Sequence, residues 1–405
     1  MKQTILLLSM SLGLLLAGCG SDDVTVPDVP QLQPSGVQLS ESQTRCVPSV
    51  NSFSSRMFRH LSASGKSMVV SPISAAFTLG MVNEGAEGAT GAEILAALGL
   101  TGQDRQAVND LFARFIDGAP GAGTDVSLCY ANMVAVNSST GSVVSDGYIS
   151  TLKEYYDAPV LTSDFSAPAA LKAVNGWCSE HTGGQIPAMM AELNPTAVMY
   201  LLNAVSFKAA WADPFDKGES RGETFRNGSD TQTIMMMHKQ ATVGYCEQDG
   251  YKAIRLAYSN GAYNITFVLP DAEGMPTAPD ELPHAFTAQE VKMALPVFTT
   301  EAETDLRAVL TAMGVRTMFT PEADLRRMTG GKPLLYVSDM RQKARLGIDE
   351  EGARAAAVTE AELSFTSAGP GGSGIKTFYA NRPFAYYISE STTGAVLFIG
   401  QFCGD

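Results

Sequence analysis

The spacing of hydrophobic residues changes along the chain. Early segments repeat apolar positions every three or four residues, which is typical of amphipathic helices. The predicted helices span 50–63, 73–83, 88–98, 106–116, 147–156, 167–181 and 303–313. Other runs are continuously apolar or alternate in period two, which indicates strands. The predicted strands span 67–70, 126–136, 198–207, 241–246, 252–258, 263–270, 334–348, 383–389 and 395–402. Because helices come mostly first and strands mostly later, an α+β fold with largely antiparallel sheets is favoured over a doubly wound parallel fold.

The chain divides into a short leader, a tether and one domain. With 405 residues, 45% of them hydrophobic, it can bury a sizeable core. Residues 1–18 have the character of a signal peptide, and 19–45 are polar and rich in proline without helical or strand periodicity. No further linker interrupts the sequence from Cys46 until about residue 350. We therefore predict a single domain over 46–405.

The first residues predict where the protein is located. Lys2 precedes an apolar run at 5–17, which is too short for a comfortable membrane span, and the run closes with "LLAGC". This resembles a bacterial lipoprotein signal, which implies cleavage before Cys19 and a lipid on its thiol. The mature chain would then be lipid-anchored at the outer membrane or cell surface. The alternative is an ordinary secretory signal with a chance cysteine.

The net charge and the cysteine content exclude some classes of partner and some kinds of site. The formal net charge of -14 argues against a nucleic-acid binder, because such proteins carry basic stripes. Besides Cys19, the cysteines are scattered and odd in number, which excludes a disulfide framework or a zinc site. Buried free thiols are the expected state, although Cys46 and Cys403 bracket the folded part and could pair.

Motifs for catalysis are missing. There is no G-x-S-x-G nucleophile elbow, no H-E-x-x-H zinc motif and no glycine-rich nucleotide loop after a strand. The "STLK" at 150–153 matches S-x-x-K, but no K-T-G follows it, so chance explains it better. We therefore expect no enzyme activity, no metal and no cofactor.

The stretch "DEEGARAAAVTEAELSFTSAGPGGSG" at 349–374 joins two acids and a glycine to a run of small residues. Together with "YANRPFAYYISESTTGAVLFIGQF" it resembles the hinge and C-terminal strands of the serpins. The blocks "VVSPISAAFTLGMVNEGAEGATGAEILAALG", "LLNAVSFKAAWADPF", "ALPVFTTEAETDLRAVLTAMGVRTMF" and "LYVSDMRQKARLGIDEEG" also resemble the family, in order. The resemblance spans nearly all of Cys46 to Phe402.

The resemblance implies three mostly antiparallel β-sheets, about nine helices and an exposed reactive loop at about 350–376. It also implies a suicide inhibitor of serine, and in some cases cysteine, proteases. The protease cleaves the loop, and the freed N-terminal half inserts as a new strand into the central sheet, a form of strand addition for which serpins are a known example. We expect a monomer. A non-inhibitory surface binding protein of the same fold is the alternative, and a hydrolase is a third reading.

The residues after the hinge glycine suit strand insertion. A segment entering between two strands cannot carry bulk on the face that meets the core. Ala353, Ala355, Ala357 and Thr359 occupy alternate positions, and all are small. The predicted hinge comprises Glu350, Glu351, Gly352, Ala353, Arg354, Ala355, Ala356, Ala357, Val358 and Thr359.

The family's spacing from Gly352 places the scissile bond between Thr366 and Ser367, which suits an elastase-like protease. A shift of one residue puts Phe365 before the bond, which a chymotrypsin- or subtilisin-like enzyme would prefer. The downstream part "SAGPGGSG" is longer and richer in glycine than is usual, so both registers stay open.

The resemblance also assigns a region where the sheet opens. Its residues are Ser71, Ser74, Asn203, Gln342 and Trp211. The family often has a histidine where this chain has Gln342, and an amide can donate and accept hydrogen bonds without titrating. The family also often pairs the first hinge acid with a lysine. Here Glu350 would face Val297, so one constraint on the loop is expected to be missing.

Overall fold

The computed structural model describes residues 36–120, 126–141, 144–271, 282–331, 335–353 and 374–405. All of them belong to one compact unit that starts at Gln33. The helices are α1 (Glu41–Thr44), α2 (Val47–Ser62), α3 (Pro72–Gly85), α4 (Gly88–Leu98), α5 (Arg105–Asp117), α6 (Asp146–Tyr156), α7 (Pro168–His181), α8 (Leu306–Ala312) and α9 (Arg326–Thr329). Short 3-10 helices are η1 (Ser138–Thr140), η2 (Lys217–Glu219) and η3 (Thr317–Phe319).

Local chemistry explains where these helices begin and end. The Asp104 side chain accepts a hydrogen bond from Ala107 N and so caps the start of α5. Helix α4 ends at Gly99, whose left-handed φ of 70° is accessible to glycine at little cost. Helix α3 is apolar around its whole circumference, and nearly all of its residues are buried. A helix of this kind belongs inside a core.

The smaller sheet has the strand order β10-β11-β12-β4-β2-β3. Its strands are β2 (Val126–Asn137), β3 (Val160–Ser163), β4 (Met199–Ala210), β10 (Phe298–Asp305), β11 (Asp339–Asp349) and β12 (Gly352–Ala353). Strands β11 and β4 pair in parallel, and so do β2 and β3. The other pairs in this sheet are antiparallel.

The larger sheet has the order β1-β15-β14-β8-β7-β6-β9-β13, with β5 paired to β6 outside this path. Its strands are β1 (Met68–Val70), β5 (Arg221–Asn227), β6 (Asp230–Gln248), β7 (Tyr251–Ala257), β8 (Tyr263–Pro270), β9 (Thr287–Pro296), β13 (Lys376–Tyr379), β14 (Phe384–Glu390) and β15 (Val396–Phe402). Among the described strands of this sheet, only β13 and β9 pair in parallel. The 19-residue β6 pairs with β5, β9 and β7 in turn, so it joins two of the three expected sheets into one.

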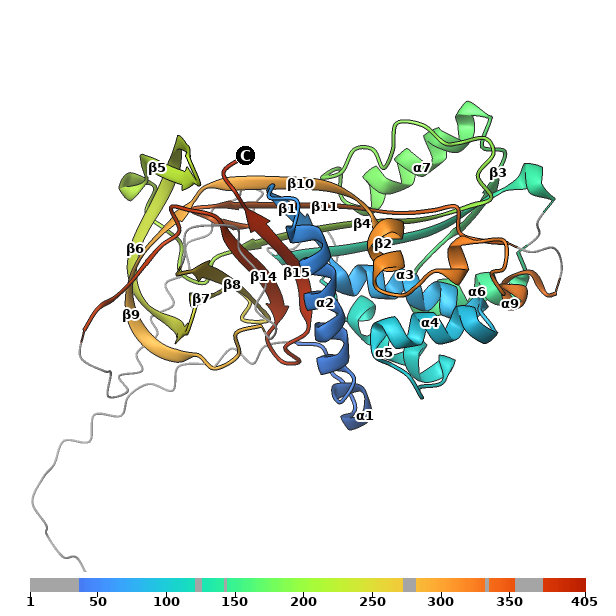
Figure 1. Cartoon of the computed structure of the whole chain (residues 1–405), viewed down its shortest axis with the longest axis horizontal. Helices are drawn as coiled ribbons and strands as arrows, with labels where there is room; N and C mark the ends of the chain where they lie inside the picture. Colours follow the sequence, from blue (N-terminus) through green and yellow to red (C-terminus); the bar gives the residue numbers. More distant parts are fainter. Residues whose placement is uncertain (1–35, 121–125, 142–143, 272–281, 332–334, 354–373) are drawn as a thin grey trace, which may run out of the picture. The chain divides into compact units, whose positions relative to one another are not determined.

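The smaller sheet is covered on both faces (Figure 1). Alternate residues of β4 explain this, because Leu201, Val205 and Phe207 belong to the main core. Tyr200 and Leu202 instead belong to a second core with α7. Figure 1 shows α7 on one side of the strands and α3 to α6 on the other. A strand buried on both faces reads as a continuous apolar run, which is why the sequence showed it clearly.

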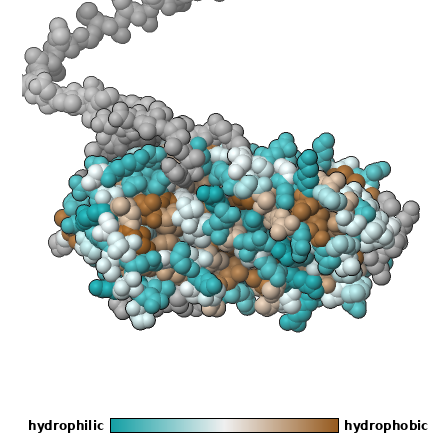
Figure 2. All heavy atoms as spheres, turned by 90° about the horizontal axis from the view of Figure 1, so that it is seen from above, coloured by the Kyte–Doolittle hydropathy of each residue, from teal (hydrophilic) through white to brown (hydrophobic). Residues whose placement is uncertain are grey.

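Hydrophobic groups on the face seen in Figure 2 lie in separate patches among polar atoms. Four large hydrophobic residues are exposed in the part of the chain that the structure describes: Ile149, Met235, Ile375 and Tyr379. Ile375 directly precedes β13, and Tyr379 is the last residue of that strand. No helix within the described ranges has the length and apolar content needed to cross a membrane.

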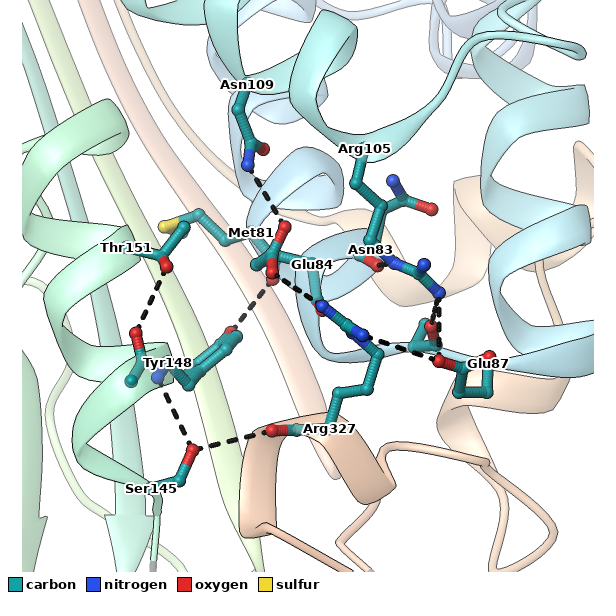
Figure 3. A network of polar contacts seen from close by, with 12 residues as sticks. Met81, Asn83, Glu84, Glu87, Arg105, Asn109, Ser145, Tyr148, Thr151 and Arg327 are labelled. Atoms are coloured by element: carbon teal, nitrogen blue, oxygen red, sulfur yellow. Dashed lines mark hydrogen bonds and ion pairs between the residues drawn. The ribbon is translucent and has the colours of Figure 1, made fainter.

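A charged network fixes the C-terminal end of α3 (Figure 3). The Glu84 carboxylate accepts hydrogen bonds from Asn109 Nδ2 of α5 at 3.0 Å and from Arg327 Nη2 of α9 at 3.3 Å. Arg105 donates to the carbonyl of Asn83 and pairs with Glu87 at 3.4 Å. We call these residues (Glu84, Glu87, Arg105, Asn109 and Arg327) the α3 network. The α3 network links helices α3, α5 and α9.

The α+β fold predicted from the sequence is confirmed, but one predicted helix is partly wrong. Residues 303–313 were expected to be helical throughout. The structure keeps Glu303–Asp305 in β10, and α8 begins at Leu306. The Asp305 side chain accepts a hydrogen bond from Arg307 N, so the strand ends and the helix starts at this cap.

Candidate functional site

Strands β11 and β4 separate toward one end, and a third strand begins between them. The parallel pairing runs from Asp339↔Tyr200 to Arg345↔Ser206 and stops there. The two residues of β12 then pair antiparallel with both neighbours, as in Ile348↔Ala353 and Ala353↔Ala209. The sheet is therefore already open by the width of one strand at this end. We call the boundary between β11 and β4 the seam.

A tight turn at 349–352, here called the hinge turn, leads from β11 into β12. The Asp349 carboxylate accepts hydrogen bonds from Glu351 N at 2.9 Å and from Gly352 N at 3.2 Å. Gly352 has a φ of 143°, and a Cβ there would lie 2.1 Å from the Ala209 carbonyl oxygen. Only glycine fits this position, for conformational and steric reasons together. Ala353 follows with 2% of its surface exposed and belongs to the main core.

Trp211 holds the hinge turn from the end of β4. Its Nε1 donates to the Asp349 carbonyl at 2.8 Å, and its backbone N donates to the Glu351 carbonyl at 2.8 Å. The indole stacks on Tyr258 with the ring centroids 4.9 Å apart and the planes 4° from parallel. Phe215 N donates to the Glu350 carbonyl at 2.9 Å. The segment after β4 therefore satisfies most backbone acceptors of the turn.

The two hinge acids are held by the segment that leads into β5. Glu350 Oε1 accepts a hydrogen bond from Ser220 Oγ at 2.6 Å. Lys217 Nζ forms an ion pair with the Glu351 carboxylate. The hydrogen bond and charge of Glu351 raise the pKa of Lys217 above its ordinary value, and the charges of Asp349 and Glu350 add to this. Ser220 therefore holds Glu350, for which the sequence predicted a missing constraint, and Lys217 holds Glu351. The sequence did not indicate either partner.

A buried cluster of neutral polar groups bridges the seam. Gln342 on β11 and Asn203 on β4 are register partners, and Gln342 Nε2 donates to Asn203 Oδ1 at 2.7 Å. Gln342 also accepts from Ser71 N at 2.7 Å and donates to the Ser71 carbonyl at 2.9 Å. Asn203 Nδ2 donates to Ser74 Oγ at 2.5 Å. We call Ser71, Ser74, Asn203 and Gln342 the seam cluster, and each is fully buried.

Two further polar residues extend this cluster. Asn203 Nδ2 lies 2.7 Å from Asn132 Oδ1 on β2, and Thr78 Oγ1 on α3 donates to the same oxygen at 3.3 Å. Sequence reasoning did not single out either residue. A polar residue within a strongly apolar run, such as Asn132 in β2, was the available signal.

The predicted scissile residues Phe365, Thr366 and Ser367 lie outside the described residues, as do 354–359 of the predicted hinge. Within the described residues, Cys46, Cys129, Cys178, Cys246 and Cys403 are free thiols. Cys46 and Cys403 therefore do not form the disulfide considered from the sequence. Burial raises the pKa of the Cys403 thiol to about 12, which keeps it protonated and unreactive. No group of three His, Cys, Asp or Glu side chains in that part of the chain is arranged to hold a metal ion.

Comparison with known proteins places this site in context. The family model Serpin (serine protease inhibitor) matches residues 48–404. The leukocyte elastase inhibitor of Bos taurus is 29% identical over 354 residues, which cover 82% of this chain and 91% of that protein.

Two solved structures are also similar. Serpin48 of the insect Tenebrio molitor matches with a TM-score of 0.79 and 28% identity, covering 90% of this chain and 99% of that chain. Human thyroxine-binding globulin complexed with thyroxine matches with a TM-score of 0.79 and 25% identity, covering 89% and 98%.

Proposed function

Because the chain belongs to the serpin family, we propose that it is a suicide inhibitor of serine endopeptidases, with cysteine endopeptidases as a second target class. The observation that carries the proposal is the position of β12. Its two residues already pair with β11 and β4 on either side. A cleaved loop could lengthen this strand without any new opening at its start.

The pairing registers of β12 predict where an extended β12 would lie. Continuing Ala353↔Ala209 places Ala355 opposite Phe207 and Ala357 opposite Val205, both of which face the main core. The same count places Thr359 between Asn203 and Gln342 of the seam cluster. Small side chains therefore meet the core, and a hydroxyl meets the polar cluster. Arg354, Ala356 and Val358 would face the other side of the sheet.

The covalent step is an acyl transfer to the protease. The nucleophilic oxygen of its serine attacks the carbonyl carbon before the scissile bond and forms an ester. The C–N bond breaks, and the proton from the nucleophile passes to the new amine of the downstream residue. Insertion of the freed segment would then add about ten backbone hydrogen bonds, or about 10 kcal/mol in total at about 1 kcal/mol each. This is comparable to the stability of a whole domain.

Target preference follows from the loop sequence. Cleavage between Thr366 and Ser367 would suit elastase-like enzymes, and the similarity to a leukocyte elastase inhibitor supports this choice. Cleavage after Phe365 would serve chymotrypsin- or subtilisin-like enzymes, whose pockets bury an aromatic ring. Trypsin-like enzymes are expected to be poor targets, because Lys376 already lies within β13. Mass spectrometry of the released C-terminal peptide would identify the bond.

The test compares two charged substitutions on opposite faces of the inserting strand. Ala357→Arg would place an unpaired charge against the core and convert the inhibitor into a substrate, so the SDS-stable protease complex should fall at least tenfold. Ala356→Arg is the matched control: continuing the register places Ala356 on the other face beside Arg345, whose side chain is 45% exposed, so a charge there can reach solvent and the complex should still form. Each variant is incubated with elastase, chymotrypsin, subtilisin and trypsin and followed by denaturing electrophoresis.

Full complex formation by Ala357→Arg would overturn the insertion mechanism. If the native chain forms no stable complex with any protease and is only cleaved, the alternative holds. That alternative is a non-inhibitory binding protein. The similarity to thyroxine-binding globulin, whose structure is complexed with thyroxine, supports it as the second candidate function.

We further propose that the mature chain is lipid-anchored through Cys19 at the outer membrane or cell surface and acts there as a monomer. The "LLAGC" sequence and the polar segment that follows it support this. Cys19→Ala should release the protein into the soluble fraction, because the lipid would be its apolar attachment. Retention of the variant on membranes after a salt wash would contradict the anchor.

A further inference from the structure

A pocket of about 360 Å³ lies beside β13, the strand that follows the reactive loop. Its lining includes Thr377 and Tyr379 of β13, Lys252 of β7 and Leu269 of β8. The remaining lining residues are Asp271, Asn381 and Arg382. The volume lies at the lower end of the range for small-molecule sites.

Two positively charged side chains line this pocket, and the acid opposite Lys252 on β6, Glu247, forms its ion pair with Lys376. Neither Lys252 nor Arg382 forms an ion pair within the described ranges of the chain. Arg382 Nη2 donates to the Pro270 carbonyl at 2.5 Å, which fixes the guanidinium. Arg382 Nε is buried and has no hydrogen-bond partner among the described residues. A buried guanidinium N–H without an acceptor is unfavourable, and an anion in the pocket would supply one.

The charge balance of the pocket contrasts with that of the whole protein. Its lining has two cations and one acid, Asp271, whereas the whole chain has a formal charge of -14. The hydroxyl of Thr377 and the amide of Asn381 add neutral hydrogen-bonding groups. Two cations against a single acid give the lining a local positive charge, which attracts anions.

The pocket also has an apolar side. Tyr379 is 39% exposed, and Leu269 also lines the pocket. A partly exposed aromatic ring offers stacking to a flat ligand. The combination of cations, neutral hydrogen-bonding groups and an exposed ring fits a small ligand with two parts.

We infer that this pocket binds small organic anions, with the carboxylate or phosphate held by Lys252 and Arg382 and the apolar part placed against Tyr379. The site lies outside the seam and the hinge turn. The inference therefore does not depend on protease inhibition.

The probe is benzoate, which joins a carboxylate to a flat ring, and benzyl alcohol is its neutral match. Binding to the full chain is measured by ligand-observed NMR. Benzoate should bind with a Kd in the millimolar range or tighter, and benzyl alcohol should bind at least tenfold more weakly. Inorganic phosphate should displace benzoate, because it competes for the same cations.

Variants locate the site. Lys252→Gln should weaken benzoate at least fivefold, and Tyr379→Ala should weaken benzoate but leave phosphate binding unchanged. Lys172→Gln, at an exposed lysine on α7, is the matched control and should bind like the native chain. Arg382→Gln is a poorer choice because its contact to Pro270 supports the fold. Equal binding of benzoate by Lys252→Gln and the native chain, or no binding at 20 mM, would overturn the inference.

Discussion

The seam cluster and the α3 network are both polar groups inside an apolar protein, but they differ in charge. The seam cluster joins β11 to β4 through amides and hydroxyls only, as in the 2.7 Å bond between Gln342 and Asn203. The α3 network joins α3, α5 and α9 through a carboxylate and guanidinium groups (Figure 3). Neutral groups can exchange one partner for another without leaving a charge buried. The seam, which is proposed to open, therefore has neutral hydrogen bonds that an inserting strand can replace. The charged contacts of the α3 network resist separation of the helices.

The strongest test of this difference is Glu84→Ala. The carboxylate side chain is 13% exposed, and its loss removes the acceptor of Asn109 Nδ2, whereas the half-exposed Arg327 keeps Glu87 as a partner. We expect a loss of about 3 kcal/mol in the free energy of unfolding, since Asn109 is 2% exposed and its amide donor is left without its charged acceptor. The stoichiometry of protease inhibition should not change. Thermal and urea unfolding measure the first quantity, and titration against elastase measures the second.

Glu87→Ala is the matched control for this variant. Its carboxylate is 39% exposed and lies 3.4 Å from Arg105, so its loss should cost less than about 1 kcal/mol. Similar losses for both variants would show that burial does not distinguish the two acids.

Gly352→Ala tests the hinge turn, and its expected effect is smaller. The added Cβ would lie 2.1 Å from the Ala209 carbonyl oxygen, so β12 must leave the sheet. We expect a cost of about 2 kcal/mol from lost pairing and backbone strain. Hydrogen exchange should show faster exchange at the amides of Trp211 and Phe215, which donate to the hinge turn.

Gly250→Ala separates the effect of backbone strain from that of the steric clash of the added Cβ. Gly250 also has a positive φ, 94°, but a Cβ there meets nothing within 4 Å. This variant should cost about 1 kcal/mol from strain alone and leave the amide of Trp211 protected. A hinge that stays equally protected in Gly352→Ala would contradict the proposed packing of β12.

The sequence predicted the strongly patterned elements and missed those that depend on partners. The helix at 88–98 was placed to the residue, because its apolar period ends at Gly99, which caps it in the structure. Only 241–246 was recognised within the 19-residue β6. The rest of β6 alternates irregularly between exposed and half-buried positions, since its neighbours change from β5 to β9 to β7. Strand β9, with its mixed sequence Thr287–Pro296, was missed for the same reason.

The candidate site shows the same limit. Ser71, Ser74, Asn203 and Gln342 were named from the family resemblance, and the structure brings them together. Ser220 and Lys217 could not be named, because they reach Glu350 and Glu351 across about 130 residues of sequence. Contacts of that kind follow from strand register and loop path, which local pattern does not encode.

Gln342→Ala tests whether the seam cluster restrains opening. The substitution removes the bond that bridges β11 and β4 and leaves Asn203 and Ser71 without that partner. We expect a loss of about 1.5 kcal/mol in stability together with faster insertion after cleavage. Trp211 contacts the hinge turn, so its fluorescence should report insertion in a Trp177→Phe background, which leaves Trp211 as the single tryptophan.

Thr78→Val is the matched control for the seam. Thr78 bonds to Asn132 and to the Ser74 carbonyl, but it lies on α3 and does not bridge the two strands. It should lose stability by about 1 kcal/mol and insert at the native rate. If both variants insert at the same rate, the bond across the seam is no barrier to opening.

The smallest expected effect concerns the ion pair between Lys217 and Glu351, whose side chains are 65% and 30% exposed. The hydrogen bond and charge of Glu351 raise the pKa of Lys217 in the folded state, so folding favours the protonated lysine. This contribution is complete below the unfolded lysine pKa of about 10.4, and it disappears as pH rises through the higher folded value. Lys217→Met should lower Tm by less than about 1 °C at pH 8, because exposed pairs contribute little. The difference between variant and native chain should vanish at strongly alkaline pH. A difference that persists unchanged at alkaline pH would assign the effect of Lys217 to packing of its side chain, not to its charge.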